Sequence, residues 1–289
     1  MKGSRRFRSV GLVAKIASPA ALKLARALEK ALKRRRLQTV FDADTAAALG
    51  KAGGVRRGRI ARLADLVFVL GGDGTLLSVA RDAPSSTPIL GINMGAMGFL
   101  SGLGREEALE RLDEVLAGKF REDRRRRLDV TIPTGPHRGT YRVLNDAVLN
   151  KEALARISTF SVTIGGRPIT RFRADGVIVA TPTGSTAYNL SAGGPILDPA
   201  LDAVVVTPIC PHTLTQRPLV LPASTKIGLV VVEEGHREGV HLTLDGQSGF
   251  PIPPGCVVGV RRCGSPATLL RPPETDHFHK LAGKLNWGV

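Results

Sequence analysis

The 289-residue sequence has little cysteine and no long apolar run. Its three cysteines, Cys210, Cys256 and Cys263, are odd in number and lack CxxC spacing, which argues against a disulfide framework or a zinc site. Such cysteine usage is typical of a reducing compartment. Lys15 interrupts the short apolar run behind the basic N-terminus, and no stretch approaches the roughly 18 apolar residues of a membrane span. We therefore expect a soluble, cytoplasmic protein.

Two common nucleotide-binding motifs are also missing. No Gly-Lys pair is followed by Ser or Thr, and no GxGxxG segment opens a helix. Walker-type and dehydrogenase interpretations therefore lose support.

Aromatic residues make up only 4% of the chain, so Val, Leu, Ile and Ala must fill most of the core, as they do in sheets covered by helices or by other sheets.

The charge is strongly of one sign, with a formal net value of +16. Such a protein attracts anions, which include nucleotides, polyphosphate, nucleic acid and acidic lipid surfaces, and charge alone does not choose among them. Two basic runs, residues 33–36 and 124–127, are more typical of solvated faces or helix ends than of a nucleic-acid site.

Strand and helix patterns alternate in the first hundred residues. Apolar runs at 10–14, 66–70 and 88–92 predict buried strands, while 20–36 and 75–81 have helical character. This alternation predicts an α/β domain over residues 1–110 with an open, mostly parallel, Rossmann-like sheet, whose ligands bind beyond the carboxyl ends of the strands. The leucine spacing of 106–116 predicts one further helix.

The pattern then changes to short β-rich runs separated by Gly, Pro and charged turns. The runs are 128–132, 141–144, 147–149, 160–164, 176–180, 203–206, 226–232, 240–244 and 257–261. They predict an all-β, sandwich-like domain over residues 120–271. The tail, 272–289, is too short for a domain, and we expect it to pack back on the first one.

The strongest local signal is Gly71-Gly72-Asp73-Gly74-Thr75, between a predicted strand and a predicted helix. Glycines permit positive φ and let backbone N–H groups approach an anion, and a helix N-terminus adds partial positive charge. This predicts a phosphate-binding turn. Asp73 would then accept a proton from an attacking hydroxyl or hold Mg²⁺, unless it only caps the helix of a tight turn.

Three other segments contain candidate binding groups. Residues 91–100 form a second glycine cluster, for which close backbone packing and ligand contact are equally plausible. Residues 181–194 contain five Ser or Thr side chains and one tyrosine, suited to a nucleoside unless the segment is an ordinary surface loop. In residues 171–176, guanidinium groups lie near Asp175, which suits diphosphate and ribose recognition or else a salt bridge.

These segments together resemble the NAD kinase family. The strings GGDGT, Asn145-Asp146, TPTGSTAYNLSAGGP and Asp245-Gly246-Gln247 stand in the family's order and approximate spacing, and GINMGAMGFL, FRADG and PICPHTLTQRPLV are also similar. GGDGT alone is shared with diacylglycerol and sphingosine kinases. The TPTGSTAYNLSAGG and DGQ strings resemble a dinucleotide site rather than a lipid site.

The resemblance implies roles for individual residues. It makes Asp73 the general base and Gly74 a nucleotide contact, and Asp146 stands where many members have Glu. The implied dinucleotide contacts are Asp73, Gly74, Asn145, Asp146, Arg156, Arg173, Asp175, Thr186, Ala187, Tyr188, Asn189, Leu190, Ser191 and Gln247. No protein ligand to a metal is implied. The dinucleotide-binding residues of the second domain should face Asp73, so we expect the active site between the domains.

The implied activity is transfer of the terminal phosphoryl group of ATP, or of polyphosphate, to the 2′-hydroxyl of the adenosine ribose of NAD, giving NADP. Mg²⁺ or another divalent metal is the implied cofactor, and a homodimer or homotetramer the implied assembly, without nucleic acid or membrane. The alternatives are a lipid kinase of the same superfamily, which should present an apolar entry, and a non-catalytic basic protein that binds nucleic acid with steep salt dependence.

Overall fold

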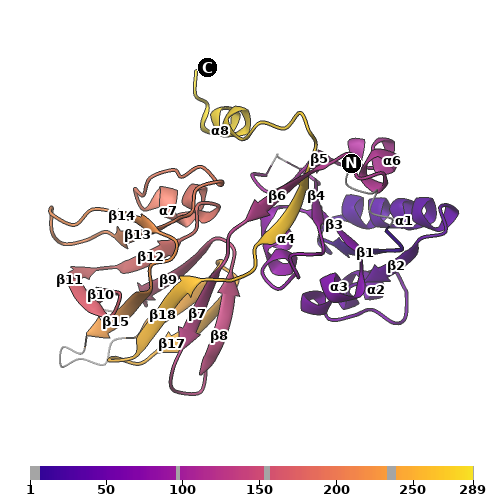
Figure 1. Ribbon diagram of the computed structural model, residues 1–289. Helices are drawn as coiled ribbons and strands as arrows, with labels where there is room; N and C mark the ends of the chain where they lie inside the picture. The colour runs from indigo at the N-terminus through magenta and orange to yellow at the C-terminus, as the bar shows by residue number, and fades with distance from the viewer. Residues whose placement is uncertain (1–6, 96–97, 153–156, 233–238, 289) are drawn as a thin grey trace. The chain divides into compact units, whose positions relative to one another are not determined.

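The computed structural model describes residues 7–95, 98–152, 157–232 and 239–288. The chain forms two compact units, one of Met1–Arg124 with Ala267–Val289 and the other of Arg125–Pro266 (Figure 1). Residues 267–271, which the sequence pattern assigned to the β-rich domain, thus lie in the first unit.

The first unit is built on a seven-stranded sheet of order β2-β1-β3-β4-β19-β6, with β5 paired to β4. Its strands are β1 (Ser9–Ala14), β2 (Gln38–Phe41), β3 (Leu66–Gly71), β4 (Ile89–Asn93), β5 (Leu103–Gly104), β6 (Arg121–Arg125) and β19 (Ala267–Arg271). The pairs β1–β2, β1–β3, β3–β4, β4–β5 and β4–β19 are parallel, which confirms the predicted mostly parallel sheet.

Helices cover both faces of this sheet. The helices of this unit are α1 (Pro19–Arg34), α2 (Ala43–Ala48), α3 (Arg57–Leu63), α4 (Asp73–Ala80), α5 (Glu107–Glu110), α6 (Leu112–Leu116) and α8 (His277–Leu285). The leucine spacing of α1 buries Leu28 and Leu32 in a cluster with Phe68 of β3. On the other face Ile60 of α3 packs so closely on Gly11 that an added Cβ would lie 3.1 Å from it.

The structure tests three further predictions, one for a helix and two for basic runs. The helix expected over 106–116 is divided at Arg111, whose φ of −95° and ψ of 8° leave the helical region. Its guanidinium donates to Glu114 and Glu274. The basic run 33–36 ends α1 and is exposed, as expected. The run 124–127 is not simply solvated, because Arg125 and Arg127 are buried.

The second unit has two six-stranded antiparallel sheets, of orders β11-β10-β15-β18-β7-β8 and β14-β13-β12-β9-β16-β17 (Figure 1). The first contains β7 (Leu128–Ile132), β8 (Gly139–Val143), β10 (Ser158–Ile164), β11 (Arg167–Ala174), β15 (Ile227–Val232) and β18 (Val257–Arg262). The second contains β9 (Asp146–Lys151), β12 (Gly176–Ala180), β13 (Ala203–Ile209), β14 (Leu219–Pro222), β16 (Val240–Leu244) and β17 (Ser248–Ile252).

The two antiparallel sheets share one core, so the predicted sandwich is confirmed. Val177 and Val179 of β12 are buried in the same cluster as Phe160 of β10. Ile178 and Ala180 point to the opposite face, where Leu197 covers them. The segment that covers this face includes a 3-10 turn at Gly184–Thr186 and the short helix α7 (Tyr188–Ser191).

Membrane-spanning character is not found in the helices. Within the described ranges, none of them combines the length and the apolar composition that a bilayer crossing requires.

Candidate active site

The GGDGT segment turns from β3 into α4. Gly71 ends the strand, Gly72 precedes the helix and Asp73 is its first residue. An added Cβ on Gly71 would lie 2.7 Å from the Thr75 hydroxyl, whereas on Gly72, which is exposed, it would meet nothing within 4 Å. Gly72 has a φ of −100°, and neither glycine has a positive φ; only Gly71 is required for close approach. The turn leaves open space at the N-terminus of α4, where an anion is favoured.

The Asp73 carboxylate is held by the second glycine cluster. Its Oδ2 accepts the Phe99 N–H at 2.8 Å, and its Oδ1 accepts the Leu100 N–H at 3.1 Å. These bonds join the side chain to residues 99 and 100 and not to the N-terminus of α4, so the helix-cap alternative does not describe it. Asp73 is partly exposed, and each oxygen keeps a lone pair for a further donor. The two N–H groups orient a carboxylate that solvent or a substrate can reach.

Gly98 explains why the second cluster contains glycine. A Cβ at this position would lie 2.1 Å from Asp73 Oδ1, which no real contact allows. Gly91 is equally constrained, since its Cβ would lie 2.6 Å from Leu76. The open choice between close packing and ligand contact is therefore resolved toward packing at Gly91 and Gly98, and at Gly98 the packed group is the candidate catalytic carboxylate.

One basic residue beside this turn was missed as a site candidate. Lys15 is exposed at the carboxyl end of β1, and its Cβ lies 3.3 Å from the position of a Cβ on Gly71. Its sequence signal was a charge directly after a buried strand, the place where parallel sheets bind ligands. Lys15 thus adds positive charge next to the GGDGT turn.

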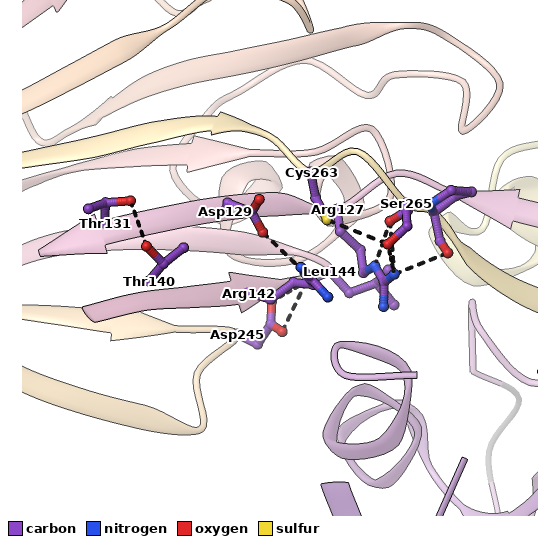
Figure 2. Close-up of polar contacts among 10 residues, drawn as sticks. Arg127, Asp129, Thr131, Thr140, Arg142, Leu144, Asp245, Cys263 and Ser265 are labelled. Carbon is purple, nitrogen blue, oxygen red and sulfur yellow. Dashed lines mark hydrogen bonds and ion pairs between the residues drawn. The ribbon is translucent and has the colours of Figure 1, made fainter. Parts of the chain in front are cut away.

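A second polar cluster lies in the β-rich unit, around Asn145 and Asp146. The hairpin between β16 and β17 turns at Asp245 and Gly246, which have φ of 51° and 63°. This turn directs the Asp245 carboxylate at three successive backbone N–H groups, those of Leu144, Asn145 and Asp146, at 2.7 to 3.2 Å. Figure 2 shows Asp245 against Leu144. Asp245 thereby fixes the backbone at the start of β9.

The side chains of Asn145 and Asp146 are poorly satisfied within the protein. Asn145 Oδ1 is buried and has no hydrogen-bond partner, a state that costs about 1–3 kcal/mol. Asp146 is 4% exposed, and burial, followed by the negative charge of Asp245, raises its pKa to about 7. Buried groups of this kind are concentrated at binding sites.

The raised pKa of Asp146 makes stability depend on pH. The folded chain binds the Asp146 proton more tightly than the unfolded chain does. Proton binding therefore contributes to the free energy of unfolding below about pH 4, and this contribution is lost as pH rises to about 7. We expect Asp146→Asn to weaken the dependence of the free energy of unfolding on pH between about pH 4 and pH 7, and to raise that free energy at pH 8 by at most about 4 kcal/mol. Urea unfolding at pH 5 and pH 8 measures the free energy of unfolding of both proteins. An unchanged pH dependence would contradict the assignment, and the exposed Asp82→Asn serves as control.

The hydroxyl-rich segment 181–194 is not a surface loop. Thr181 donates from Oγ1 to the Leu144 carbonyl at 2.6 Å, and Ser185 donates from Oγ to the Pro182 carbonyl at 2.7 Å while accepting the Leu197 N–H. A Cβ on Gly184 would lie 2.2 Å from the Asn145 carbonyl oxygen. The hydroxyls of Thr181 and Ser185 therefore form hydrogen bonds within the protein. This differs from the expectation that the hydroxyls of this segment bind a nucleoside.

Asn189 also points into the protein. Its Nδ2 donates to the carbonyls of Ser185 and Pro195 at 3.0 and 3.1 Å, and its Oδ1 accepts the Thr207 hydroxyl at 2.6 Å. The residue is fully buried, so this conformation offers no carboxamide to a ligand. The rest of the predicted stretch is more open: Thr186, Ala187 and Leu190 are partly exposed, and Tyr188 and Ser191 are exposed.

The remaining candidates of this unit have different surroundings. Arg173 is exposed on β11. Asp175 forms its ion pair with Lys151 at 3.7 Å, so the salt bridge expected within 171–176 is made with another strand. Gln247 is exposed directly after the Asp245-Gly246 turn. Arg156 lies outside the described residues.

The family models match both units. The ATP-NAD kinase N-terminal domain matches residues 10–120, and the ATP-NAD kinase C-terminal domain matches residues 144–271. The NAD kinase of Trichlorobacter lovleyi is 43% identical over 98% of this chain and 99% of its own length, and that of Geobacter metallireducens is 42% identical with the same coverage.

Solved structures agree with the fold. Yeast NADH kinase, crystallised with NADH, has a TM-score of 0.87 at 25% identity, covering 98% of this chain and 89% of its own. An NAD kinase of Archaeoglobus fulgidus in complex with ATP has a TM-score of 0.77 at 24% identity, covering 96% and 98%.

Fold and comparisons together define a kinase of two units, an α/β unit with the GGDGT turn and a β-sandwich unit with Asn145 and the buried Asp146. The chain belongs to the NAD kinase family and is an enzyme of that family.

Proposed function

We propose that the enzyme transfers the terminal phosphoryl group of ATP, or of polyphosphate, to the 2′-hydroxyl of the adenosine ribose of NAD, giving NADP. The observation that carries this proposal is the Asp73 carboxylate, fixed by two backbone N–H groups at the phosphate-binding turn. The description of the matching family models, ATP-NAD kinase, supports ATP as the donor.

In this mechanism Asp73 orients the ribose hydroxyl and accepts its proton. The ribose oxygen forms a bond to the terminal phosphorus, the bridging P–O bond breaks, and ADP or the shortened polyphosphate leaves with the electron pair. A carboxylate is a weak base for an alcohol, but phosphoryl transfer has a loose transition state in which orientation and charge neutralisation matter most. The two N–H donors supply that orientation before substrate binds.

The β-rich unit supplies the proposed dinucleotide contacts. Asn145 fits this role because its buried Oδ1 would gain a donor from the ligand. Gly74 lies in the phosphate-binding turn. Asn189 is assigned a packing role, because its carboxamide is fully occupied. The other proposed contacts are Asp146, Arg156, Arg173, Asp175, Thr186, Ala187, Tyr188, Leu190, Ser191 and Gln247.

Divalent metal is expected to arrive with the donor phosphates. Among the residues that the structure describes, no three His, Cys, Asp or Glu side chains form a group that could hold an ion. Mg²⁺ commonly binds through one or two carboxylates and substrate phosphates, so the open turn beside Asp73 fits such an ion. When bound, it would neutralise phosphate charge.

The direct test incubates purified protein with NAD, Mg²⁺ and either ATP or polyphosphate, and measures NADP. Product with one donor and not the other identifies the donor. Failure to form NADP with either donor would overturn the proposal.

We also propose a homodimer or homotetramer and a cytoplasmic location. Size-exclusion chromatography with light scattering tests the assembly, and cell fractionation tests the location.

Arg173 is expected to contribute mainly to binding. Charge-assisted hydrogen bonds contribute about 1.5–3 kcal/mol, so Arg173→Ala should raise the Michaelis constant for NAD by roughly tenfold or more with little change in kcat. Arg167→Ala removes the same charge from the other end of β11 and should change neither constant. A Michaelis constant equal to the parent's in Arg173→Ala would refute the assignment.

A further inference from the structure

Arg271, at the end of β19, is an arginine that neither the family motifs nor the proposed mechanism uses. It is 2% exposed. Its Nη2 donates to the Phe99 carbonyl at 2.9 Å, its Nη1 donates to the Ser101 carbonyl, and its Nε donates to Asp123 Oδ2 at 3.1 Å. A buried guanidinium with these partners is rigidly held, because its planar fork matches fixed acceptors.

The acceptors of Arg271 belong to the backbone segment that holds Asp73. The Phe99 carbonyl and the Leu100 N–H are the two ends of one peptide group. Arg271 bonds the carbonyl end, and the N–H end donates to Asp73 Oδ1 at 3.1 Å. One planar peptide therefore joins the buried guanidinium to the catalytic carboxylate.

We propose that Arg271 is a positioning residue for Asp73, acting through the Phe99–Leu100 peptide and anchored by Asp123. A charged donor at the carbonyl polarises the peptide and strengthens hydrogen bonding at its N–H. The same contact fixes the plane of the peptide, and with it the direction in which the Asp73 carboxylate faces. This inference rests on the proposed role of Asp73 in phosphoryl transfer.

If Arg271 only stabilised the segment 99–101, loss of another cation that stabilises this segment should lower kcat by a similar factor. Lys280 of α8 donates to the Ser101 carbonyl at 2.8 Å, so it stabilises the same segment. The peptide that it contacts carries the Gly102 N–H, which donates to Gly91 and not to Asp73. Lys280→Met is therefore a matched control, since it removes a cation from the segment without touching the peptide that holds Asp73.

The main test compares Arg271→Lys with Lys280→Met in steady-state kinetics. Lysine keeps the charge but cannot span both carbonyls and Asp123. We expect kcat to fall by about tenfold to a hundredfold in Arg271→Lys, with Michaelis constants for NAD and ATP within about twofold, because small misplacements of catalytic groups have effects of this size. Lys280→Met should keep kcat within about twofold. Equal losses in the two variants would overturn the proposal.

A double-mutant cycle with Asp73→Asn separates positioning from general damage. If Arg271 acts through Asp73, Arg271→Lys should change the residual rate of Asp73→Asn by less than about twofold. The same fold loss in both backgrounds would overturn the inference. If Asp73→Asn itself leaves turnover unchanged, the proposed function of Asp73 fails instead.

Asp123→Asn keeps the test decisive if Arg271→Lys does not fold. It preserves the guanidinium and both carbonyl contacts but weakens their anchor. We expect kcat to fall by roughly threefold to tenfold, and the loss to vanish in the Asp73→Asn background. An unchanged kcat in folded Asp123→Asn would contradict the role assigned to this pair, and thermal unfolding establishes that the variant is folded.

Discussion

Replacing Asp73 by Asn should lower kcat by about 10²- to 10⁴-fold while leaving the dissociation constant of NAD within about twofold. The range is what a general base commonly contributes to the rate. The amide keeps the size of the side chain, but it has no basic oxygen pair, and its NH₂ group cannot accept the Phe99 or Leu100 N–H that the carboxylate accepts. Steady-state kinetics and calorimetric titration of NAD measure the two quantities.

The control for this prediction is Asp82→Asn. Asp82 follows α4, has a half-exposed side chain and lies 4.0 Å from Arg81, so its carboxylate is screened by solvent. Its replacement should change neither kcat nor NAD affinity. A turnover number unchanged in Asp73→Asn would remove Asp73 from the mechanism.

Adding one methyl group at Gly98 should be almost as damaging. In Gly98→Ala the new Cβ would lie 2.1 Å from Asp73 Oδ1, so the carboxylate must leave its two N–H donors. Displacement by about 1 Å commonly costs a hundredfold in rate, and we expect kcat to fall by about that factor or more. Stability should fall as well, because the displaced carboxylate loses hydrogen bonds.

Two further variants test this steric account. Gly264→Ala adds a Cβ that meets nothing within 4 Å at an exposed position of ordinary φ, so it should leave activity unchanged. Combining Gly98→Ala with Asp73→Ala removes the overlapping oxygen, and the double variant should unfold at a higher temperature than Gly98→Ala alone. Full activity in Gly98→Ala would mean that Asp73 need not occupy its observed position.

The sequence predicted the strand, turn and helix around GGDGT because their signals are local. A continuous apolar run followed by two glycines is the pattern of a buried parallel strand that ends at a ligand site. Residues 66–75 show this pattern, and the structure has β3, the Gly72 turn and α4 there. The partners of Asp73 were not predictable, because the backbone N–H groups of Phe99 and Leu100 leave no trace in side-chain chemistry.

Other differences arise where tertiary contacts outweigh local pattern. The arginine run 124–127 has the composition of a solvated face, yet Arg125 and Arg127 are buried. Arg127 donates to Ser265 (Figure 2) and also to the Pro266 carbonyl. The predicted β-rich domain extended to residue 271, whereas β19 (267–271) pairs with β4 in the parallel sheet. Neither partner choice is encoded in the periodicity of the segment itself.

Asn189 illustrates the same limit within the site. A polar side chain in a hydroxyl-rich stretch looked suited to a ligand, but its carboxamide is enclosed by Ser185, Pro195 and Thr207. Sequence pattern gives the chemistry of a side chain and not its direction. Burial and hydrogen-bond partners decide whether that chemistry is offered to a substrate or used within the protein.

The most direct measurement is a single-turnover assay of NADP formation, with NAD and the Mg²⁺ complex of ATP saturating, for the parent and for Asp73→Asn. The account predicts a 2′-phosphorylated dinucleotide from the parent and a rate at least about a hundredfold lower from the variant, with both proteins binding NAD equally. Equal rates would contradict the assignment of Asp73, and the absence of NADP from the parent with either ATP or polyphosphate would contradict the proposed reaction.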